Sequence, residues 1–371
     1  TILDDKILAI NDTRLVEAWH QSGGETEELD CENCLTLPGL VDWHVHFGGA
    51  GGEGGAVYRT SPLSLSALTS AGITTAVGLL GTDGYCRSLR ELIMKARALQ
   101  EEGITAWIFT GAYQIPGPTL TSDVASDIIL VDKVIGLKVA FSDHRASQVT
   151  IQRLQEIAAQ SRLGGILSGK CGLVMVHIGE GENRLEPLLY IAQDSDIPLS
   201  QFIPTHLNRS SSVLKQAIAY GLAGGRVDIT AGVSERYYFP GAIKPSIAVA
   251  QLLKNKVDLK NITMSSDGNG VLTRTDPQTG IKKPLLAPVH ALIEELGDMI
   301  REGISVENAA RICSTNAADA MQLPGRKGHV VAGADADIIV LDKQYKLRHV
   351  IARGRLMVKE GKVIQKGCFE Q

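Results

Sequence analysis

Eight short apolar runs, separated by longer amphipathic segments, are the feature that most limits how this chain can fold. The runs are residues 40–46, 72–81, 103–112, 134–141, 172–179, 200–207, 226–232 and 261–268. The segments between them repeat apolar residues at intervals of three and four, as in residues 88–102, 146–163 and 211–224, which is typical of helices. Strands that alternate with helices build a parallel sheet, and eight such units close into a barrel.

The two ends of the chain show a different pattern. Residues 1–36 read as short strands between polar turns, and strands joined by Gly-containing turns return from residue 325. Residues 287–302 and 305–321 are expected to form closing helices. The sequence therefore predicts an α/β fold, a (β/α)8 TIM-like barrel with a small β-sandwich domain formed from both chain ends. We assign residues 37–324 to the barrel and residues 1–36 and 325–371 to the small domain.

Composition excludes several classes of partner. The 371 residues hold 37 Lys and Arg against 41 Asp and Glu, a net charge of −4, so no basic field attracts nucleic acid. No apolar run approaches the roughly 18 residues of a membrane helix. The first residues, TILDDKILAI, lack a signal-peptide pattern, and the six cysteines are scattered, so we expect a cytoplasmic protein. Cys31 and Cys34 form one CxxC pair, but no second CxxC pair supports a zinc knuckle or a redox pair.

Unusual polar residues collect at the carboxyl ends of the apolar runs, where strand ends of a barrel meet. Neutral imidazoles and carboxylates are zinc ligands. A lysine inside an apolar run must also be neutralised, which is costly for an ordinary buried lysine. An alternating pair of histidines can also belong to an ordinary strand, but the whole set predicts a metal site: His44, His46, Lys138, His177, His206 and Asp267.

These motifs resemble those of the amidohydrolase superfamily with a binuclear metal centre. A glycine-rich loop that follows His46 and carries Glu53 narrows the resemblance to the isoaspartyl dipeptidase family. The matching runs span nearly the whole chain: PGLVDWHVHFGGAGGE, GLLGTD, TGAY, VIGLKVAFSDHR, MVHIGE, PTHLNR and SSDGNG, with GADADIIVLD and ARGRLMVKEGK near the carboxyl end.

The resemblance implies a chemistry for the metal site. Two zinc ions per subunit would be bound, one by His44, His46 and Asp267 and the other by His177 and His206, with carboxylated Lys138 as the bridge. A metal-bridging hydroxide would hydrolyse the β-aspartyl bond of dipeptides. Asp267 would act as general base and acid, and Tyr113 would donate a hydrogen bond to the oxyanion.

The resemblance also implies how the substrate is bound. Glu53 would pair with the α-amine, and Arg145 and Arg209 would grip carboxylates, which suits a planar guanidinium. Gly51 and Thr82 would contact the aspartyl group. The partners implied are β-aspartyl dipeptides and further copies of the same chain in a homo-oligomer.

One residue departs from the family pattern. Val271 stands where a substrate-contacting serine is expected, so one polar contact is missing while every metal ligand is kept. Other binuclear amidohydrolases remain alternatives, either dihydroorotase- or hydantoinase-like ring openers or N-acyl-amino-acid deacylases. Gly48 argues against a dihydroorotase, which carries arginine two residues after the second histidine. A non-catalytic scaffold is a third alternative, although it has no reason to keep Lys138 or Asp267.

Overall fold

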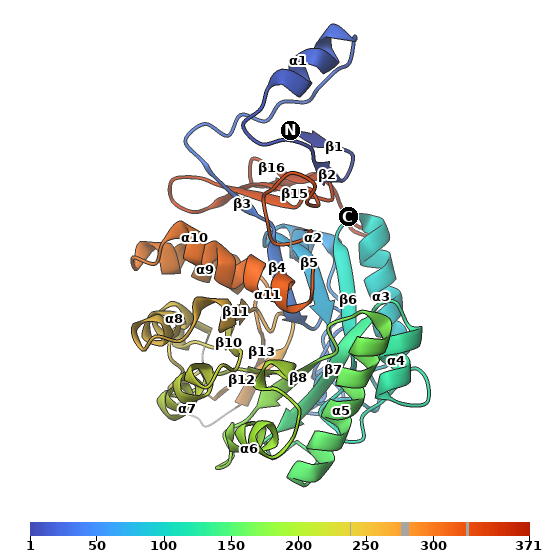
Figure 1. Ribbon diagram of the computed structural model, residues 1–371, viewed down its shortest axis with the longest axis vertical. Coiled ribbons are helices and arrows are strands. Elements are labelled where there is room, and N and C mark those ends of the chain that lie inside the picture. Colours follow the sequence, from blue (N-terminus) through green and yellow to red (C-terminus); the bar gives the residue numbers. More distant parts are fainter. Residues whose placement is uncertain (238, 276–281, 324–325) are drawn as a thin grey trace.

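A ring of parallel strands surrounded by helices forms the centre of the molecule (Figure 1). The structure, a computed structural model, describes residues 1–237, 239–275, 282–323 and 326–371. A six-stranded sheet runs in the order β4 to β9, and β10 and β11 form a parallel pair. Backbone hydrogen bonds close the ring, because Leu207 N donates to Asp228 O (3.3 Å) and Asp267 N donates to His44 O (3.0 Å). The predicted TIM-like barrel is confirmed.

Each predicted apolar run contains one barrel strand. These strands are β4 (Leu40–Val45), β5 (Ile73–Gly78), β6 (Thr105–Gly111), β7 (Val134–Phe141), β8 (Leu173–Ile178), β9 (Phe202–Thr205), β10 (Val227–Thr230) and β11 (Ile262–Ser265). A hairpin, β12 (Val271–Thr275) and β13 (Lys282–Leu286), follows the last of them. The barrel strands are buried almost throughout because helices cover them from outside.

The helices lie between the strands, as the periodicity predicts. They are α2 (Leu65–Thr69), α3 (Leu89–Glu102), α4 (Val124–Leu130), α5 (Ile151–Ser168), α6 (Glu186–Asp194), α7 (Ser211–Leu222), α8 (Pro245–Lys254) and α9 (Ala291–Arg301). Helix α5 begins later than expected because Thr150 caps it, its side chain accepting a hydrogen bond from Arg153 N (3.2 Å). The last predicted helix is α10 (Val306–Ala310) and α11 (Asn316–Ala320) with a π-helical turn between them. Among the described residues, no helix combines the length and the apolar character needed to span a membrane.

Both chain ends contribute to a second, antiparallel sheet. Its order is β17-β16-β15-β14-β3, with β3 (Leu35–Pro38) from the amino-terminal part and β14 (Ile338–Leu341), β15 (Leu347–Ala352), β16 (Arg355–Lys359) and β17 (Lys362–Val363) from the other end. A hairpin of β1 (Ile2–Leu3) and β2 (Lys6–Ile7) packs against this sheet through Ile7. The predicted β-sandwich from both ends is confirmed. The residue boundaries stay a prediction, since β3 runs through positions 36 and 37 and residues 324 and 325 lie outside the described part.

One prediction for the amino-terminal residues is wrong. Helix α1 (Arg14–Gln21) stands where only strands and turns were expected, and it lies at the far end of the molecule from the barrel (Figure 1). Leu15 and Trp19 are four residues apart, which is a helical rather than a strand spacing. The hydroxyl of Thr13 donates to Glu17 (2.9 Å) at the start of the helix.

A buried carboxylate ties together the strands that carry the polar cluster. Asp228 on β10 accepts hydrogen bonds from side chains of three other strands. The donors are Trp43 Nε1 (2.8 Å), Thr205 Oγ1 (2.7 Å), Thr263 Oγ1 (2.8 Å) and Ser265 Oγ (2.6 Å). Burial raises the pKa of Asp228, and these four hydrogen bonds offset part of that rise. Asp228 therefore fixes β4, β9 and β11 relative to β10.

Replacing Asp228 with Ala should destabilise the protein strongly. Four buried donors would lose their acceptor, at about 1 kcal/mol or more for each, so the free energy of unfolding should fall by about 4 kcal/mol. Urea unfolding measures this loss. Asp194→Ala, on an exposed aspartate, is the matched control and should change the value by less than about 0.5 kcal/mol. Equal effects of the two substitutions would contradict the role of Asp228.

Candidate metal centre and substrate pocket

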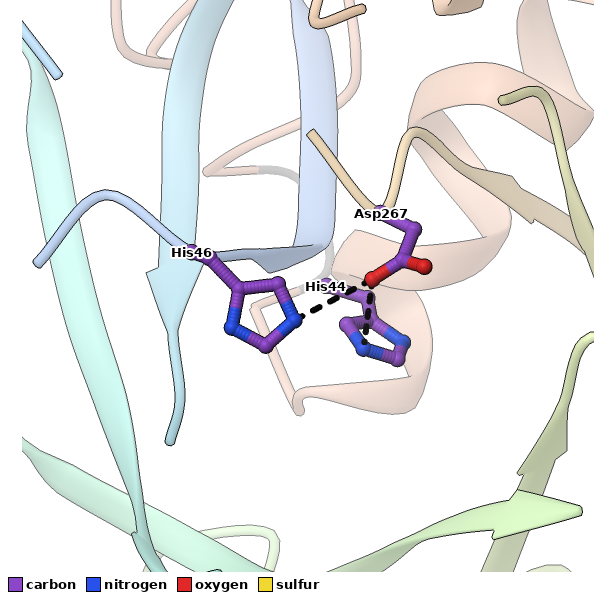
Figure 2. A group of neighbouring side chains, drawn as sticks. All are labelled: His44, His46 and Asp267. Carbon is purple, nitrogen blue, oxygen red and sulfur yellow. Dashed lines mark hydrogen bonds and ion pairs between the residues drawn. The ribbon is translucent and has the colours of Figure 1, made fainter. Parts of the chain in front are cut away.

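Two histidines and an aspartate converge at the carboxyl end of the barrel. His44 lies in β4, His46 directly after it, and Asp267 two residues after the end of β11. Figure 2 shows both imidazoles turned toward the Asp267 carboxylate, whose Oδ1 lies 3.4 Å from His44 Nε2 and 3.1 Å from His46 Nε2. A tetrahedral zinc with bonds of about 2.0–2.1 Å needs ligand atoms about 3.4 Å apart. The spacing and the donor types of these three residues fit a zinc ion.

His177 and His206 form a second pair beside the first. His177 is the penultimate residue of β8 and His206 follows β9, with ring centres 4.6 Å apart. The His206 ring centre is 5.1 Å from that of His44. The Thr230 hydroxyl lies 2.9 Å from His206 Nδ1, which leaves Nε2 of that ring for a ligand. Lys138 in β7 is fully buried, and its Nζ lies 3.3 Å from His44 Nε2. All six predicted metal-binding residues therefore lie in one cluster.

The protonation states of the cluster suit cation binding. Burial lowers the pKa of His44, His177 and His206 well below the ordinary value, so these rings are neutral. His44 and His206 can each offer a lone pair, whereas both ring nitrogens of His177 have hydrogen-bond partners, Tyr113 and Asp143. Burial also lowers the pKa of Lys138 to about 7. A lysine with this pKa is partly a free amine at neutral pH, which an ordinary lysine is not.

Backbone conformation helps to aim two of these side chains. His206 (φ 65°) and Asp267 (φ 54°) both adopt the left-handed region within two residues of the ends of their strands. Few residues with a side chain adopt this region, although His and Asp do so more often than most. Such conformations collect at functional sites, where the surrounding structure holds them.

A hydrogen-bonded chain leads from the cluster to the predicted substrate contacts. Tyr113, after β6, has its hydroxyl 2.5 Å from His177 Nδ1, and burial raises the pKa of that hydroxyl, so it remains a proton donor. His177 Nε2 lies 2.9 Å from Asp143 Oδ2. Arg145 donates to both oxygens of Asp143 (2.9 and 2.8 Å) and to Glu53 Oε1 (2.8 Å). Burial alone would raise the pKa of Asp143, but hydrogen bonds from Arg145 and His177 hold it below its usual value.

A cavity of about 270 Å³ opens above the cluster. Every predicted substrate contact lines it: Glu53, Gly51, Thr82, Arg145 and Arg209, with Tyr113, Asp267 and Val271. Gly51 has φ 91°, and a Cβ there would lie 1.9 Å from the carbonyl oxygen of Tyr58, so only glycine fits. Val271 presents an apolar side chain to the cavity and packs against Gly51. The sequence after Val271 also differs from the family pattern, and its residues 276–281 lie outside the described part of the chain.

Three residues of the site were not identified from the sequence. Asp143 and Thr230 each contact one ring nitrogen of a clustered histidine, and Phe239 lines the cavity. Thr230 had a usable signal, because it ends a barrel strand at the face where the other polar residues collect. Asp143 and Phe239 lie in loops, where periodicity gives no orientation.

Comparisons with known proteins agree with this fold and site. The model of the amidohydrolase family matches residues 205–363. The β-aspartyl dipeptidase of Fervidobacterium islandicum AW-1, solved in complex with the dipeptide β-Asp-Leu, is 35% identical, with 97% of this chain and 92% of that chain covered and a TM-score of 0.85. Two further solved structures share the fold. One is a D-hydantoinase, 18% identical, with 100% of this chain and 93% of that chain covered and a TM-score of 0.67. The other is the dihydropyrimidinase of Brevibacillus agri NCHU1002, 17% identical, with 99% of this chain and 92% of that chain covered and a TM-score of 0.64.

The barrel, the second sheet and the cluster of histidines at the strand ends define an amidohydrolase. One fold can host many different activities, so the class alone leaves the substrate open. The identity over nearly the full length is more specific, and the chain belongs to the isoaspartyl dipeptidase family. It is an enzyme, a hydrolase of that family.

Proposed function

We propose that this enzyme hydrolyses the β-aspartyl bond of dipeptides in a zinc-dependent reaction. The observation that carries the proposal is a single cavity that joins a metal-type cluster to two arginines and one glutamate. An isoaspartyl dipeptide presents two carboxylates and one amine around the scissile amide, which complements those charges. We also propose a cytoplasmic homo-oligomer. The six cysteines are all free, which supports the location, and the family resemblance supports the oligomer.

Two zinc ions, when bound, would acidify a water molecule and polarise the scissile carbonyl. His44, His46 and Asp267 would hold one ion, and His177 with His206 the other. Lys138 would serve as the shared ligand after its neutral Nζ adds to carbon dioxide and releases one proton, which converts the neutral amine into a carbamate anion. The lowered pKa of Lys138 supports this step, because only the free amine reacts.

Two side chains would act on the reacting atoms. A carboxylate oxygen of Asp267 would accept the proton of the attacking water and then deliver it to the leaving amine. The Tyr113 hydroxyl would donate to the carbonyl oxygen as negative charge develops there, since burial keeps that hydroxyl protonated. Glu53 would hold the α-amine, and Arg145 and Arg209 would each bind a carboxylate of the substrate.

The test is hydrolysis of β-Asp-Leu, compared with α-Asp-Leu and dihydroorotate, with zinc counted in the same preparation. Turnover of β-Asp-Leu alone, with about two zinc ions per chain, is the expected result. If the enzyme binds two zinc ions but does not hydrolyse β-Asp-Leu, its function is another amidohydrolase reaction. Dihydroorotate opening would identify that reaction as ring hydrolysis.

Glu53→Gln should weaken binding of substrates that carry a free α-amine. The charged hydrogen bond to the amine is worth about 1.5–3 kcal/mol, so KM for β-Asp-Leu should rise about 10- to 100-fold. Succinyl-leucine lacks only the amine and is the matched ligand. Its inhibition constant should be nearly the same for the variant and the wild type, and an unchanged KM for β-Asp-Leu would dismiss the amine contact.

Val271→Ser should restore a polar contact in the cavity. One added hydrogen bond is worth about 0.5–1.5 kcal/mol, so KM for β-Asp-Leu should fall about 2- to 10-fold while kcat and zinc content stay constant. Val271→Ala is the control, because it removes the same bulk without adding a hydroxyl. If both variants behave alike, side-chain size rather than the hydroxyl sets the effect.

A further inference from the structure

The two arginines of the cavity are held in different ways. Arg145 is locked by carboxylates, with two hydrogen bonds to Asp143 and one to Glu53. Arg209 forms no ion pair among the described residues, and its Nε is buried without a hydrogen-bond partner there. Its guanidinium carbon instead lies 5.4 Å from the ring centre of Phe239. Burial without a counter-ion lowers the pKa of Arg209, so an anion from outside the chain would be strongly favoured at this position.

Phe239 lies in the loop between β10 and α8, and that loop is tied to the residue next to Arg209. The side-chain amide of Asn208 donates to Val233 O (2.7 Å) and to Ile243 O (3.1 Å), on either side of Phe239. In return, Ile243 N donates to Asn208 O (2.8 Å). Phe239 and Arg209 are therefore fixed relative to each other by the backbone on both sides.

Helix α9 fixes the same loop from outside. Glu294 and Asp298 in α9 and Glu302, directly after its last residue, are spaced by four and so lie on one side of the helix. Arg236 pairs with Glu294 (3.1 Å), and Lys244 pairs with Asp298 (2.9 Å) and Glu302 (2.6 Å). The Tyr237 hydroxyl also donates to Glu294 (2.5 Å). These contacts hold the loop on both sides of Phe239.

We propose that Phe239 is a positioning residue that holds Arg209 in place as the receptor for one substrate carboxylate. An aromatic face attracts a guanidinium without neutralising it, so every N–H group stays available for a carboxylate. A glutamate in the place of Phe239 would position Arg209 equally well but would compete with the substrate. The proposal rests on the proposed function, because it assigns a role in binding a β-aspartyl dipeptide.

The main test compares Phe239→Leu with Phe239→Tyr, using β-Asp-Leu as substrate. The leucine variant keeps apolar bulk and loses the aromatic face, so KM should rise about 5- to 20-fold while kcat stays within about twofold. The tyrosine variant keeps the ring and should stay within about twofold of the wild type in both constants. A fall in kcat at constant KM, or equal damage in both variants, would overturn the proposal.

A second measurement separates positioning from general disturbance of the site. Two competitive ligands each lack one carboxylate: β-aspartyl-leucine amide lacks the terminal group, and β-alanyl-leucine lacks the α-carboxylate. The affinity loss of Phe239→Leu should vanish with the ligand that lacks the group bound by Arg209 and persist with the other. Loss with both ligands would refute the assignment. Failure of the wild-type enzyme to cleave β-Asp-Leu would contradict the proposed function. If the wild-type enzyme is active but Phe239→Leu changes neither KM nor kcat, only the role of Phe239 is contradicted.

Discussion

Lys138→Ala is expected to lower kcat/KM for β-Asp-Leu by at least about three orders of magnitude. Bound zinc supplies several kcal/mol of transition-state stabilisation, and each 1.36 kcal/mol corresponds to a factor of ten. Lys138 is fully buried with its Nζ beside His44, and alanine there leaves no group that could become the shared anionic ligand. The zinc content should therefore fall below two per chain.

Short carboxylic acids should partly rescue this variant, because acetate can occupy the volume left by the side chain and supply two anionic oxygens. Lys133→Ala is the matched control. Lys133 is a partly buried lysine whose pKa burial also lowers, to about 8, but it lies just before β7, whereas Lys138 lies within that strand. It should keep full activity. Robust turnover by Lys138→Ala without any added acid would rule out the carbamate.

The barrel could be predicted because its signal repeats. Each strand is an apolar run between amphipathic segments, and an error in one run leaves seven others to specify the architecture. The clustered residues could be predicted for a related reason. Strand ends of a barrel share one face, so position in the chain alone brings His44 near His206 and Asp267. Neither the barrel nor the cluster depends on how the chain runs through a loop.

Residues in loops could not be predicted in this way. Phe239 contacts Arg209 across 30 positions of the chain, and that contact depends on how Asn208 binds the loop. Asp143 looks from the sequence like any solvated aspartate, and only its position between His177 and Arg145 gives it a function in the site. Helix α1 was missed because it is only eight residues long, and so short a segment shows little more than two turns of the helical period.

Asp267→Asn is expected to lower kcat by about 10²- to 10⁴-fold, the usual contribution of a general base. The substitution is suited to isolating proton transfer because it disturbs little else. Asp267 has a left-handed backbone conformation that asparagine also adopts readily, and its backbone N–H donates to His44 O, which the variant keeps. The amide oxygen can still face His44 and His46, but an amide does not accept a proton at neutral pH.

The zinc content decides how this result is interpreted. His44 and His46 remain in the variant, so much of the metal should stay bound while turnover is lost. Lys138→Ala should instead lose metal and turnover together, and the contrast separates the residue that moves a proton from the residue that holds the centre together. Turnover of zinc-loaded Asp267→Asn within about tenfold of the wild type would assign proton transfer to another group. His144 would then be the next residue to replace, because it lines the cavity and is exposed to solvent.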